Sequence, residues 1–442
     1  MRQVLLHEGA RQLDYEIRDI VKKAEALESL GQKIYWENIG DPILKNAVVP
    51  AWIKEILTDL VNDNSTYGYC HSKGVLETRQ YVAEKNNIRG GVQITSDDVL
   101  FFNGLGDAIG KLYQFLNPYS RVIGPSPAYS THSALEAAHS NKEPLTYNLD
   151  PENNWYPDLD DLRLKVRYNP NIVGILVINP DNPTGMVYPV EVLKEIVEIA
   201  KEFNLFLVSD EIYTNIIYNG VETKALAEVL GDVPGIAMKG ISKDTPWPGS
   251  RCGWMEFYNR KSDPDFDQFC LTLENAKMVE VCSTTLPQKA LPIIQEHPKF
   301  KEYLIERREE IESRSDIISE HLKKIPYITF NKTNGAFYNT IVFKDGAINN
   351  KQFMHIDDPK IRSLAEKWVE KIGEPDKRFV YYLLAAKGVC VVPLSSFQSE
   401  LRGFRITLLE ENVEVLNATF SKIAEAIEEF CTSDIKIEAP LT

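Results

Sequence analysis

The sequence predicts an α/β protein with a large three-layer domain, built on a mostly parallel central sheet, and a smaller α+β domain. Short apolar runs alternate with amphipathic stretches between residues 97 and 257, a pattern typical of buried parallel strands covered by helices on both faces. Beyond residue 300 the pattern changes to long charged helices and a few short apolar runs. The length of 442 residues also favours two domains.

The large domain is expected to contain six strands from its apolar runs and three helices from the stretches between them. The expected strands are 99–102, 120–124, 172–178, 205–208, 236–238 and 252–257, and the expected helices are 108–115, 133–138 and 189–203. The last helix has the clearest signals, because Pro189 stands near its start and Val192, Ile196 and Phe203 fall on one face.

The smaller domain is expected in the C-terminal third of the chain. Residues 300–324 predict a long charged helix, 325–343, 389–394 and 403–408 predict strands of a small sheet, and 412–430 predict a closing helix. Charged and apolar residues alternate at helical spacing over 13–30, which predicts an N-terminal helix. We therefore divide the chain into an N-terminal segment 1–50 that joins the small domain, a large domain 51–305 and a C-terminal small domain 306–442.

Composition argues against several classes of partner. The formal net charge of −15 disfavours nucleic acid and anionic membrane surfaces, and no apolar run is long enough to span a membrane. The N-terminus lacks the pattern of a signal peptide. Six widely spaced cysteines without a C-x-x-C pair favour thiols in a reducing compartment over disulfides or a metal site. We expect a cytoplasmic protein that uses no metal.

Lys243 is the strongest chemical signal in the chain. It follows the apolar run Ile236–Met238 and precedes a turn rich in proline and glycine, with Arg251 eight residues further on. A lysine held between two buried strands is explained most economically as the imine-forming partner of an aldehyde cofactor, with a guanidinium near the phosphate of that cofactor. The alternative is an ordinary polar loop.

Three further loops with chemically active residues follow the expected strands. Ligands bind beyond the carboxyl ends of the strands in an open parallel sheet. Asn103–Asp107 is a glycine turn before a helix, which suits a phosphate, although a plain tight turn is the alternative. Asn179–Gly185 is a rigid turn, and Asp210 ends an apolar strand where it needs a cationic partner unless it caps a helix.

These residues together resemble the class I (fold type I) pyridoxal-phosphate-dependent aminotransferases. The resemblance is carried by ordered motifs from about residue 35 to residue 430: Gly40-Asp41-Pro42, Tyr67-Gly68-Tyr69 with Gly74, Asn-Pro-x-Asn-Pro-Thr-Gly at 179–185, Ser-Asp-Glu-Ile-Tyr at 209–213, Ser242-Lys243 with Arg251, and Phe-Arg-Ile-Thr at 404–407. It implies the fold of the pyridoxal-phosphate-dependent transferases and transfer of an amino group from an L-amino acid to a 2-oxo acid, with 2-oxoglutarate the expected acceptor.

The resemblance implies how pyridoxal 5'-phosphate is held. Lys243 forms the aldimine and moves a proton between the substrate Cα and C4′ of the cofactor, and Asp210 pairs with the pyridinium nitrogen. Asn182 and Tyr213 hydrogen-bond O3′ of the ring. The phosphate is assigned to Arg251, the Ser242 hydroxyl and the backbone at Gly104 and Leu105. The aromatic side chain that stacks on the ring corresponds to Tyr129, while His132 is either a histidine behind the aspartate or a capping or surface residue.

The substrate and subunit roles also follow from the resemblance. Arg405 is expected to bind the substrate α-carboxylate, assisted by the Gly40 backbone and by Asn182. Tyr69 is expected to reach the phosphate of the partner subunit, so the active unit would be a homodimer with shared active sites.

Three positions depart from the family pattern. Gly240 replaces a frequent phosphate-binding serine, the Trp247 loop is flanked by prolines, and Val279 stands where dicarboxylate-specific members carry an arginine. An unpaired second carboxylate is costly to bury. We therefore expect a neutral or aromatic donor, alanine or tyrosine, in preference to aspartate.

Two alternatives to transamination stay open at the level of sequence. A β-lyase of the C–S lyase type would use the same lysine and the same cofactor contacts. A regulator built on an aminotransferase-like domain would need a fused DNA-binding segment or a missing lysine, and Lys243 is present.

Overall fold

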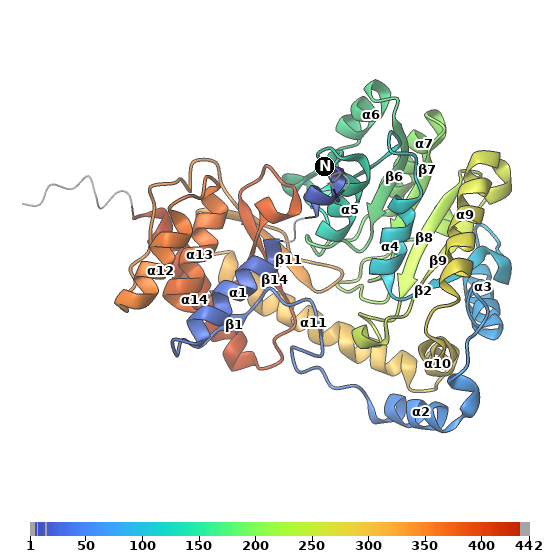
Figure 1. Ribbon diagram of the computed structural model, residues 1–442. Coiled ribbons are helices and arrows are strands. Elements are labelled where there is room, and N and C mark those ends of the chain that lie inside the picture. Colours follow the sequence, from blue (N-terminus) through green and yellow to red (C-terminus); the bar gives the residue numbers. More distant parts are fainter. Residues whose placement is uncertain (1–4, 7, 14–15, 434–442) are drawn as a thin grey trace, which may run out of the picture.

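The computed structural model describes residues 5, 6, 8–13 and 16–433 and contains two sheet systems (Figure 1). The larger sheet has eight strands in the order β2-β9-β8-β7-β6-β3-β4-β5. Their bounds are β2 (Val99–Phe102), β3 (Arg121–Ser126), β4 (Thr146–Asp150), β5 (Tyr156–Pro157), β6 (Ile172–Ile178), β7 (Phe206–Asp210), β8 (Gly235–Gly240) and β9 (Gly253–Tyr258).

The centre of this sheet is parallel, as expected, and its antiparallel strands lie towards the two edges. Strands β8, β7, β6, β3 and β4 pair in parallel, whereas β9 runs antiparallel to both β8 and β2, and β5 runs antiparallel to β4. Parallel neighbours bring their carboxyl ends to one edge. The loops after β6, β7 and β8 therefore meet at that edge.

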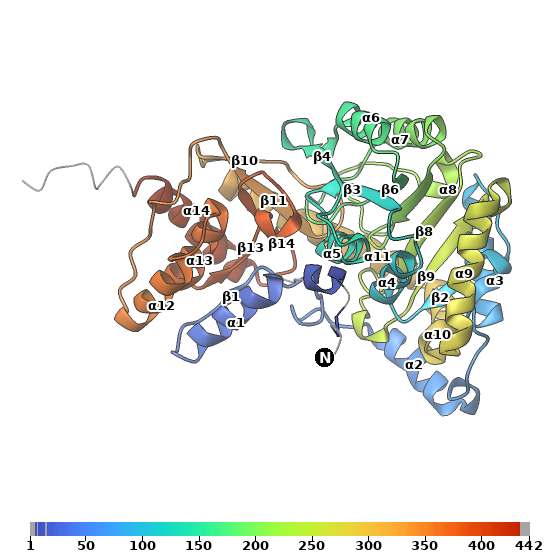
Figure 2. The same ribbon diagram turned by 45° about the horizontal axis from the view of Figure 1, so that its top comes forward.

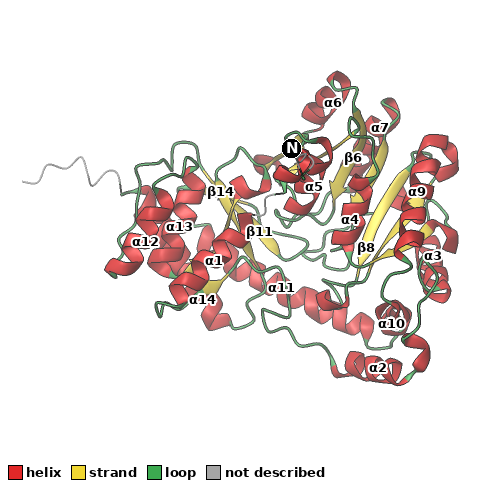
Figure 3. Ribbon diagram, viewed as in Figure 1, coloured by secondary structure: helices red, strands yellow, loops and turns green. Residues whose placement is uncertain are grey.

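Helices cover both faces of the large sheet (Figures 1 and 3). Leu176 and Ile178 of β6 face one cluster, which includes apolar residues of α4 (Leu105–Gln114) and α9 (Pro264–Glu280). Ile175 and Val177 face the other cluster, with α3 (Leu76–Arg89), α6 (Leu159–Tyr168), α7 (Val190–Glu202) and α8 (Leu226–Val229). The alternation along β6 follows from the two-residue period of a strand, and it confirms the predicted three layers.

The smaller sheet is antiparallel in the order β10-β11-β14-β13, with the bounds β10 (Ile328–Phe330), β11 (Tyr338–Phe343), β13 (Val392–Pro393) and β14 (Gly403–Thr407). It shares one apolar cluster with the N-terminal α1 (Glu16–Glu28) and with α13 (Pro375–Lys387) and α14 (Val413–Cys431). The helix α12 (Pro359–Val369) packs in the same cluster (Figure 2).

One expected strand was wrong in its pairing. The run 389–394 is not a single strand of the small sheet, because β12 (Val389–Cys390) pairs in parallel with β1 (Tyr35–Trp36), while β13 pairs with β14. An apolar run shows burial but not which neighbour it pairs with. The β1–β12 ladder joins the N-terminal segment to the C-terminal part of the chain.

A long helix connects the two parts of the molecule. The N-terminal end of α11 (Phe300–Leu322) packs through Phe300 against α2 (Ala51–Asn62) and α10 (Thr285–Gln295), whereas Ile311 and Ile318 belong to the cluster around the small sheet (Figure 1). The predicted domain boundary at 305/306 falls inside this helix, and the three-part division stays a proposal.

Two helices of the large domain begin or end away from their expected positions. The helix expected at 108–115 starts at Leu105, directly after Gly104, whose φ of +82° lets the chain turn sharply into the helix. The helix expected at 133–138 is α5 (Ser130–Ser140).

Candidate active site

A cavity lies at the carboxyl edge of the large sheet, and eight of the predicted site residues line it. Its empty volume is about 700 Å³, which includes space open to solvent. The predicted residues that line it are Leu105, Tyr129, Asn182, Asp210, Tyr213, Ser242, Lys243 and Arg251. They come from six different loops or element ends, which agrees with the expected convergence at this edge.

Lys243 is anchored on both its main chain and its side chain. Its Nζ donates a hydrogen bond to the carbonyl oxygen of Gly40 at 2.8 Å, and its own carbonyl oxygen accepts from Nη2 of Arg307 on α11 at 3.1 Å. The lysine is half-buried. The amino group of Lys243 is held at the wall of a cavity by a neutral carbonyl oxygen and has no carboxylate partner among the described residues, so that as the free amine it is placed to react with a carbonyl compound.

Asp210 is the last residue of β7 and is buried against His132. Its Oδ2 lies 3.1 Å from Nε2 of His132, and its Oδ1 accepts from the backbone N–H of Ile212 at 3.2 Å. His132 is itself buried, and its ring makes T-shaped contacts with the rings of Tyr113 and Tyr129. The histidine therefore lies behind the aspartate, and the alternative of a surface residue is wrong.

Tyr213 lies deep in the site and contacts a residue that the sequence did not suggest. Its hydroxyl donates to the hydroxyl of Tyr338, on β11 of the small sheet, at 3.2 Å. Burial, together with the neighbouring Tyr338 hydroxyl, raises the pKa of Tyr213 well above its usual range. Tyr213 is therefore a neutral hydrogen-bond donor in this site.

One end of the cavity is suited to an anion. Gly104 precedes the first residue of α4, and a Cβ at this position would lie 2.5 Å from Nη2 of Arg251. The guanidinium thus lies directly over the glycine turn, beside the N-terminus of a ten-residue helix. Ser242 lines the same cavity. This arrangement fits the phosphate of the expected cofactor.

Arg405 is buried and contacts Asn182, which lines the cavity. Its guanidinium lies 4.5 Å from the ring centre of Tyr338 and 5.1 Å from that of Phe397. Nη2 donates to the carbonyl oxygen of Asn38 at 2.7 Å and Nη1 to Oδ1 of Asn182 at 3.4 Å. Nε has no hydrogen-bond partner in the described part of the chain. A buried guanidinium without a carboxylate partner is suited to a carboxylate ligand.

Gly40 closes the site from the N-terminal segment. A Cβ at this position would collide with the hydroxyl of Tyr338. Only glycine therefore lets this backbone approach the wall formed by Tyr338 while its carbonyl oxygen accepts from Lys243.

Gly40, Gly104 and Arg405 do not line the cavity itself but contact Lys243, Arg251 and Asn182, which do. Tyr69 lies outside this group. It is 86% exposed in the single chain, and Val279 is 88% exposed. Neither lines the cavity described above. The trans role of Tyr69 and the specificity role of Val279 remain predictions.

Sequence reasoning missed part of the cavity wall, namely Gly106, Ile178, Ile212, Pro248 and Tyr338. Tyr338 is the most important omission, since it contacts both Tyr213 and Arg405. It begins an apolar strand of the other sheet, so no local pattern distinguishes it from a core tyrosine.

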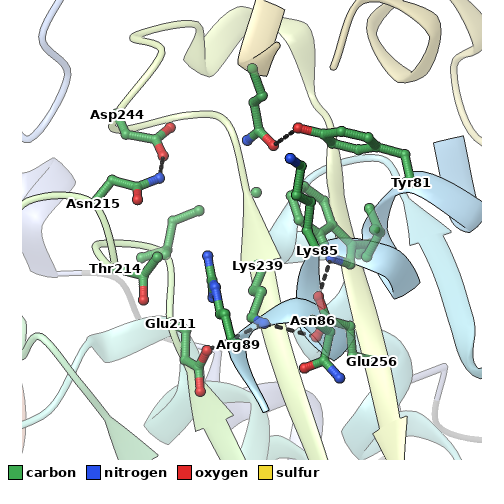
Figure 4. Close-up of a pocket in the computed structure, with 15 residues that line it drawn as sticks. Tyr81, Lys85, Asn86, Arg89, Glu211, Thr214, Asn215, Lys239, Asp244 and Glu256 are labelled. Atoms are coloured by element: carbon green, nitrogen blue, oxygen red, sulfur yellow. Dashed lines mark hydrogen bonds and ion pairs between the residues drawn. The ribbon is translucent and has the colours of Figure 1, made fainter. Parts of the chain in front are cut away.

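A buried ion network supports the strands that carry the site. Lys239 on β8 lies 2.7 Å from Oε2 of Glu256 on β9 and 3.5 Å from Oε2 of Glu211, the residue after Asp210. These side chains line a second cavity, on the side of the sheet covered by α3 (Figure 4). Burial alone would raise the pKa of Glu256, but the charge of the Lys239 ammonium and hydrogen bonds from Lys239, Tyr258 and Trp254 hold it below its ordinary value.

The donor set fits pyridoxal phosphate. A carboxylate, a lysine, a tyrosine and an amide surround one cavity, and an arginine over a glycine turn forms an anion cradle at its end. Among the described residues no group of three potential metal ligands occurs. No helix in the described part of the chain is both long and apolar enough to cross a membrane.

Comparison with known proteins gives matches along nearly the whole chain. Residues 38–419 match the family described as aminotransferase class I and II. An uncharacterised aminotransferase of Methanocaldococcus jannaschii is 51% identical over 430 residues, covering 97% of this chain and 99% of that protein. A glutamate-pyruvate aminotransferase of Escherichia coli is 33% identical over 351 residues, covering 78% and 83%. The structure of an alanine aminotransferase from Pyrococcus furiosus superposes with a TM-score of 0.84 at 29% identity, covering 96% and 100%.

Proposed function

This chain belongs to the class I and II aminotransferases, and from that membership we propose that its preferred amino donor is a small neutral L-amino acid, alanine first, with 2-oxoglutarate as the acceptor. The similarity to a glutamate-pyruvate aminotransferase of Escherichia coli and to an alanine aminotransferase from Pyrococcus furiosus supports an alanine–glutamate pair. The expected tyrosine-like donor is the second choice. The β-lyase alternative has no support in these comparisons, and we do not propose it.

The observation that carries the proposal is the placement of Arg405 beside Asn182, a residue that lines the cavity, while a second cation, Arg251, lies over the glycine turn at Gly104. A cofactor phosphate and a substrate carboxylate need two separate cationic sites, and Lys243 lines the cavity with Asn182 and Arg251. The absence of a carboxylate partner at Nη1, Nη2 and Nε of Arg405, among the described residues, leaves it available to the α-carboxylate.

The protein residues have separate tasks in this mechanism. Pyridoxal phosphate supplies an aldehyde that takes up the amino group and a ring that withdraws electrons from Cα. Lys243 would be the base that removes the proton from the substrate Cα, and it would then donate this proton to C4′ of the cofactor. Asp210 would keep a proton on the ring nitrogen, and His132 would orient the carboxylate of Asp210. Asn182 and Tyr213 would hold the ring oxygen.

We also propose that the active unit is a homodimer in which Tyr69 acts in the neighbouring site. The support is the exposure of Tyr67, Tyr69 and Val279, which are 72%, 86% and 88% exposed in the single chain and which a subunit interface would cover. We further propose a cytoplasmic location, supported by the free thiols of Cys70, Cys252, Cys270, Cys282 and Cys390.

The experiment that tests the donor assignment offers single amino acids to the purified holoenzyme. Conversion of the aldehyde form of the cofactor to the amine form is followed by absorption, and kcat/KM is then measured for alanine, glutamate, tyrosine and aspartate. We expect alanine to exceed aspartate. An aspartate value about tenfold above both alanine and tyrosine would show that the interpretation of Val279 is wrong.

A further inference from the structure

A second acidic residue, Asp181, lies next to Asn182 and has no role in the mechanism above. It follows β6 and is 0% exposed. Its Oδ2 accepts from the backbone N–H of Thr184 at 3.0 Å and from the Thr184 hydroxyl at 2.5 Å. Its Oδ1 is buried and has no hydrogen-bond partner among the residues described. A carboxyl group that is half satisfied and fully buried needs an explanation.

The main chain of Asp181 closes the turn that presents Asn182. The N–H of Asp181 donates to the carbonyl oxygen of Met186 at 2.9 Å, and its own carbonyl oxygen accepts from the N–H of Gly185 at 3.1 Å. Asn182 extends from this turn to the cavity, where its Oδ1 accepts from Arg405. The hydrogen bonds that Asp181 makes with Thr184, Gly185 and Met186 therefore also fix the position of Asn182, which lies in the same turn.

The surroundings of Asp181 are acidic or neutral. Asp210 on β7 and the buried tyrosines Tyr147 on β4 and Tyr188 are the titratable groups that interact with it. No described cation lies within ion-pair distance of its carboxyl group. Burial raises the pKa of Asp181 to about 7, and the charge of Asp210 adds to this, against the opposing effect of the Thr184 hydrogen bonds. Burial and the Asp181 charge also hold the pKa of Tyr188 well above its usual range, so this tyrosine stays neutral.

We propose that Asp181 is a positioning residue for the substrate carboxylate, acting through Asn182: gain or loss of a proton at its carboxyl group changes how firmly the turn 181–186 holds Asn182 beside Arg405. The proposal rests on the proposed function, which assigns Arg405 to the carboxylate. The ionised group makes charge-assisted hydrogen bonds to Thr184, which are stronger than those of the neutral acid. Ionisation should therefore tighten the turn and favour carboxylate binding.

An Asp181 carboxyl group that only holds the turn and one that also titrates predict different results for Asp181→Asn. If Asp181 only fixes the shape of the turn, Asp181→Asn retains an oxygen that accepts both hydrogen bonds from Thr184, and its effects are the same at every pH. If Asp181 titrates, the difference between wild type and Asp181→Asn depends on pH. Asp376→Asn is the matched control, because Asp376 is also 0% exposed and burial raises its pKa as well. Asp376 lies on α13, accepts a hydrogen bond from the N–H of Ser395 and does not line the cavity.

The first test measures thermal stability of the cofactor-free chains at about pH 5.5 and about pH 8.5. The pKa of Asp181 rises from 3.8 to about 7 on folding, so the folded state binds the proton more tightly and stability falls as pH rises through this range. Asp181→Asn cannot lose a proton. We expect the melting temperature of wild type, relative to Asp181→Asn, to be several degrees lower at the higher pH. An equal difference at the two pH values would overturn the titration.

The second test measures binding of 2-methylalanine to the holoenzyme, since this amino acid has no Cα hydrogen and is not transaminated. The ratio of Kd values, Asp181→Asn over wild type, is expected to rise about threefold between about pH 6 and about pH 8.5, equivalent to half a pKa unit of coupling. The ratio for Asp376→Asn should stay constant. A constant ratio for Asp181→Asn would contradict the proposal.

Two outcomes separate this proposal from the proposed function. Turnover of alanine combined with a pH-independent Kd ratio overturns the role of Asp181 alone. Failure of every donor to convert the cofactor overturns the proposed function, and the stability test still reports whether Asp181 titrates. Asp181→Ala, which removes the acceptor for Thr184, should weaken binding of 2-methylalanine at both pH values.

Discussion

Nζ of Lys243 donates a hydrogen bond to the carbonyl oxygen of Gly40 at 2.8 Å, across 203 positions of sequence. Lys243 follows a strand of the large sheet, whereas Gly40 belongs to the segment that enters the small domain through β1. The active site is therefore closed by residues from both parts of the chain. If the N-terminal segment moved away from the large sheet, Nζ of Lys243 would lose the carbonyl oxygen of Gly40 as its hydrogen-bond acceptor.

Replacing Lys243 should abolish transamination without preventing cofactor binding. Lys243→Ala removes both the carbonyl-reactive amine and the base at Cα, while the anion cradle at Gly104 and Arg251 is unchanged. We expect kcat to fall by about three orders of magnitude or more, with the cofactor retained in spectra of the purified protein. Lys201→Ala, on the exposed surface of α7, is the control. Activity above a few per cent of wild type would refute the assignment.

Asp210→Ala should lose most transaminase activity because the cofactor ring becomes a poorer electron acceptor. Without the carboxylate the ring nitrogen loses its proton and withdraws electrons poorly, and buried His132 loses its Nε2 partner. We expect weak cofactor retention and loss of most turnover, measured by absorption and by steady-state rate. Asp232→Ala, at an exposed aspartate, should behave as wild type. Normal spectra together with normal turnover in Asp210→Ala would contradict the role of Asp210.

Arg405→Ala should raise KM for every amino acid and oxo acid. The guanidinium is the cation that we assign to the α-carboxylate common to all of these substrates, and a lost charge-assisted contact costs about 2 kcal/mol or more. Arg402→Ala provides a control three residues away, at a side chain that is 42% exposed. A KM change confined to one substrate would instead place Arg405 in the side-chain pocket.

Mixed dimers test the position of Tyr69. Tyr69→Ala and Lys243→Ala chains are each expected to be inactive or severely impaired, and subunit exchange between them should restore activity, because some sites then combine an intact Tyr69 with an intact Lys243. Tyr67→Ala in place of Tyr69→Ala serves as the neighbouring exposed control. Heterodimers that form without any recovery of activity would mean that Tyr69 does not act across the interface.

The buried ion network should be more sensitive to the loss of one member than to the loss of a pair. Lys239→Met leaves Glu256 and Glu211 buried without their cation and should cost about 3 to 5 kcal/mol. Adding Glu256→Gln should recover part of this loss, as measured by urea unfolding in a double-mutant cycle.

The same network gives stability a defined dependence on pH. The pKa of Glu256 in the folded protein lies below its ordinary value of 4.5. Ionised Glu256 therefore stabilises the folded state above pH 4.5, and this stabilisation declines as the pH falls through the folded pKa. Glu256→Gln should lose less stability than wild type between about pH 5 and about pH 3. Equal losses in the two proteins would contradict the lowered pKa.

The local pattern of residues was enough to predict the sheet and its principal loops. Alternating apolar runs predicted the strands that became β2, β3, β6, β7, β8 and β9, because burial on two faces is a property of consecutive residues. The loops after β6, β7 and β8 were likewise predictable, since parallel strands bring their carboxyl ends to one edge. The motifs within those loops indicated the family, and the family match over residues 38–419 confirmed it.

Tertiary structure alone decided which distant residues complete the site. His132 pairs with Asp210 across 78 positions, Tyr213 with Tyr338 across 125, and Lys243 with Gly40 across 203. Likewise, the run 389–394 divides between two ladders, and the burial of Asp181 becomes visible only when its neighbours are in place. The physical reason is that periodicity reports whether a residue is buried, while its partners depend on strand pairing and helix packing between segments far apart in sequence.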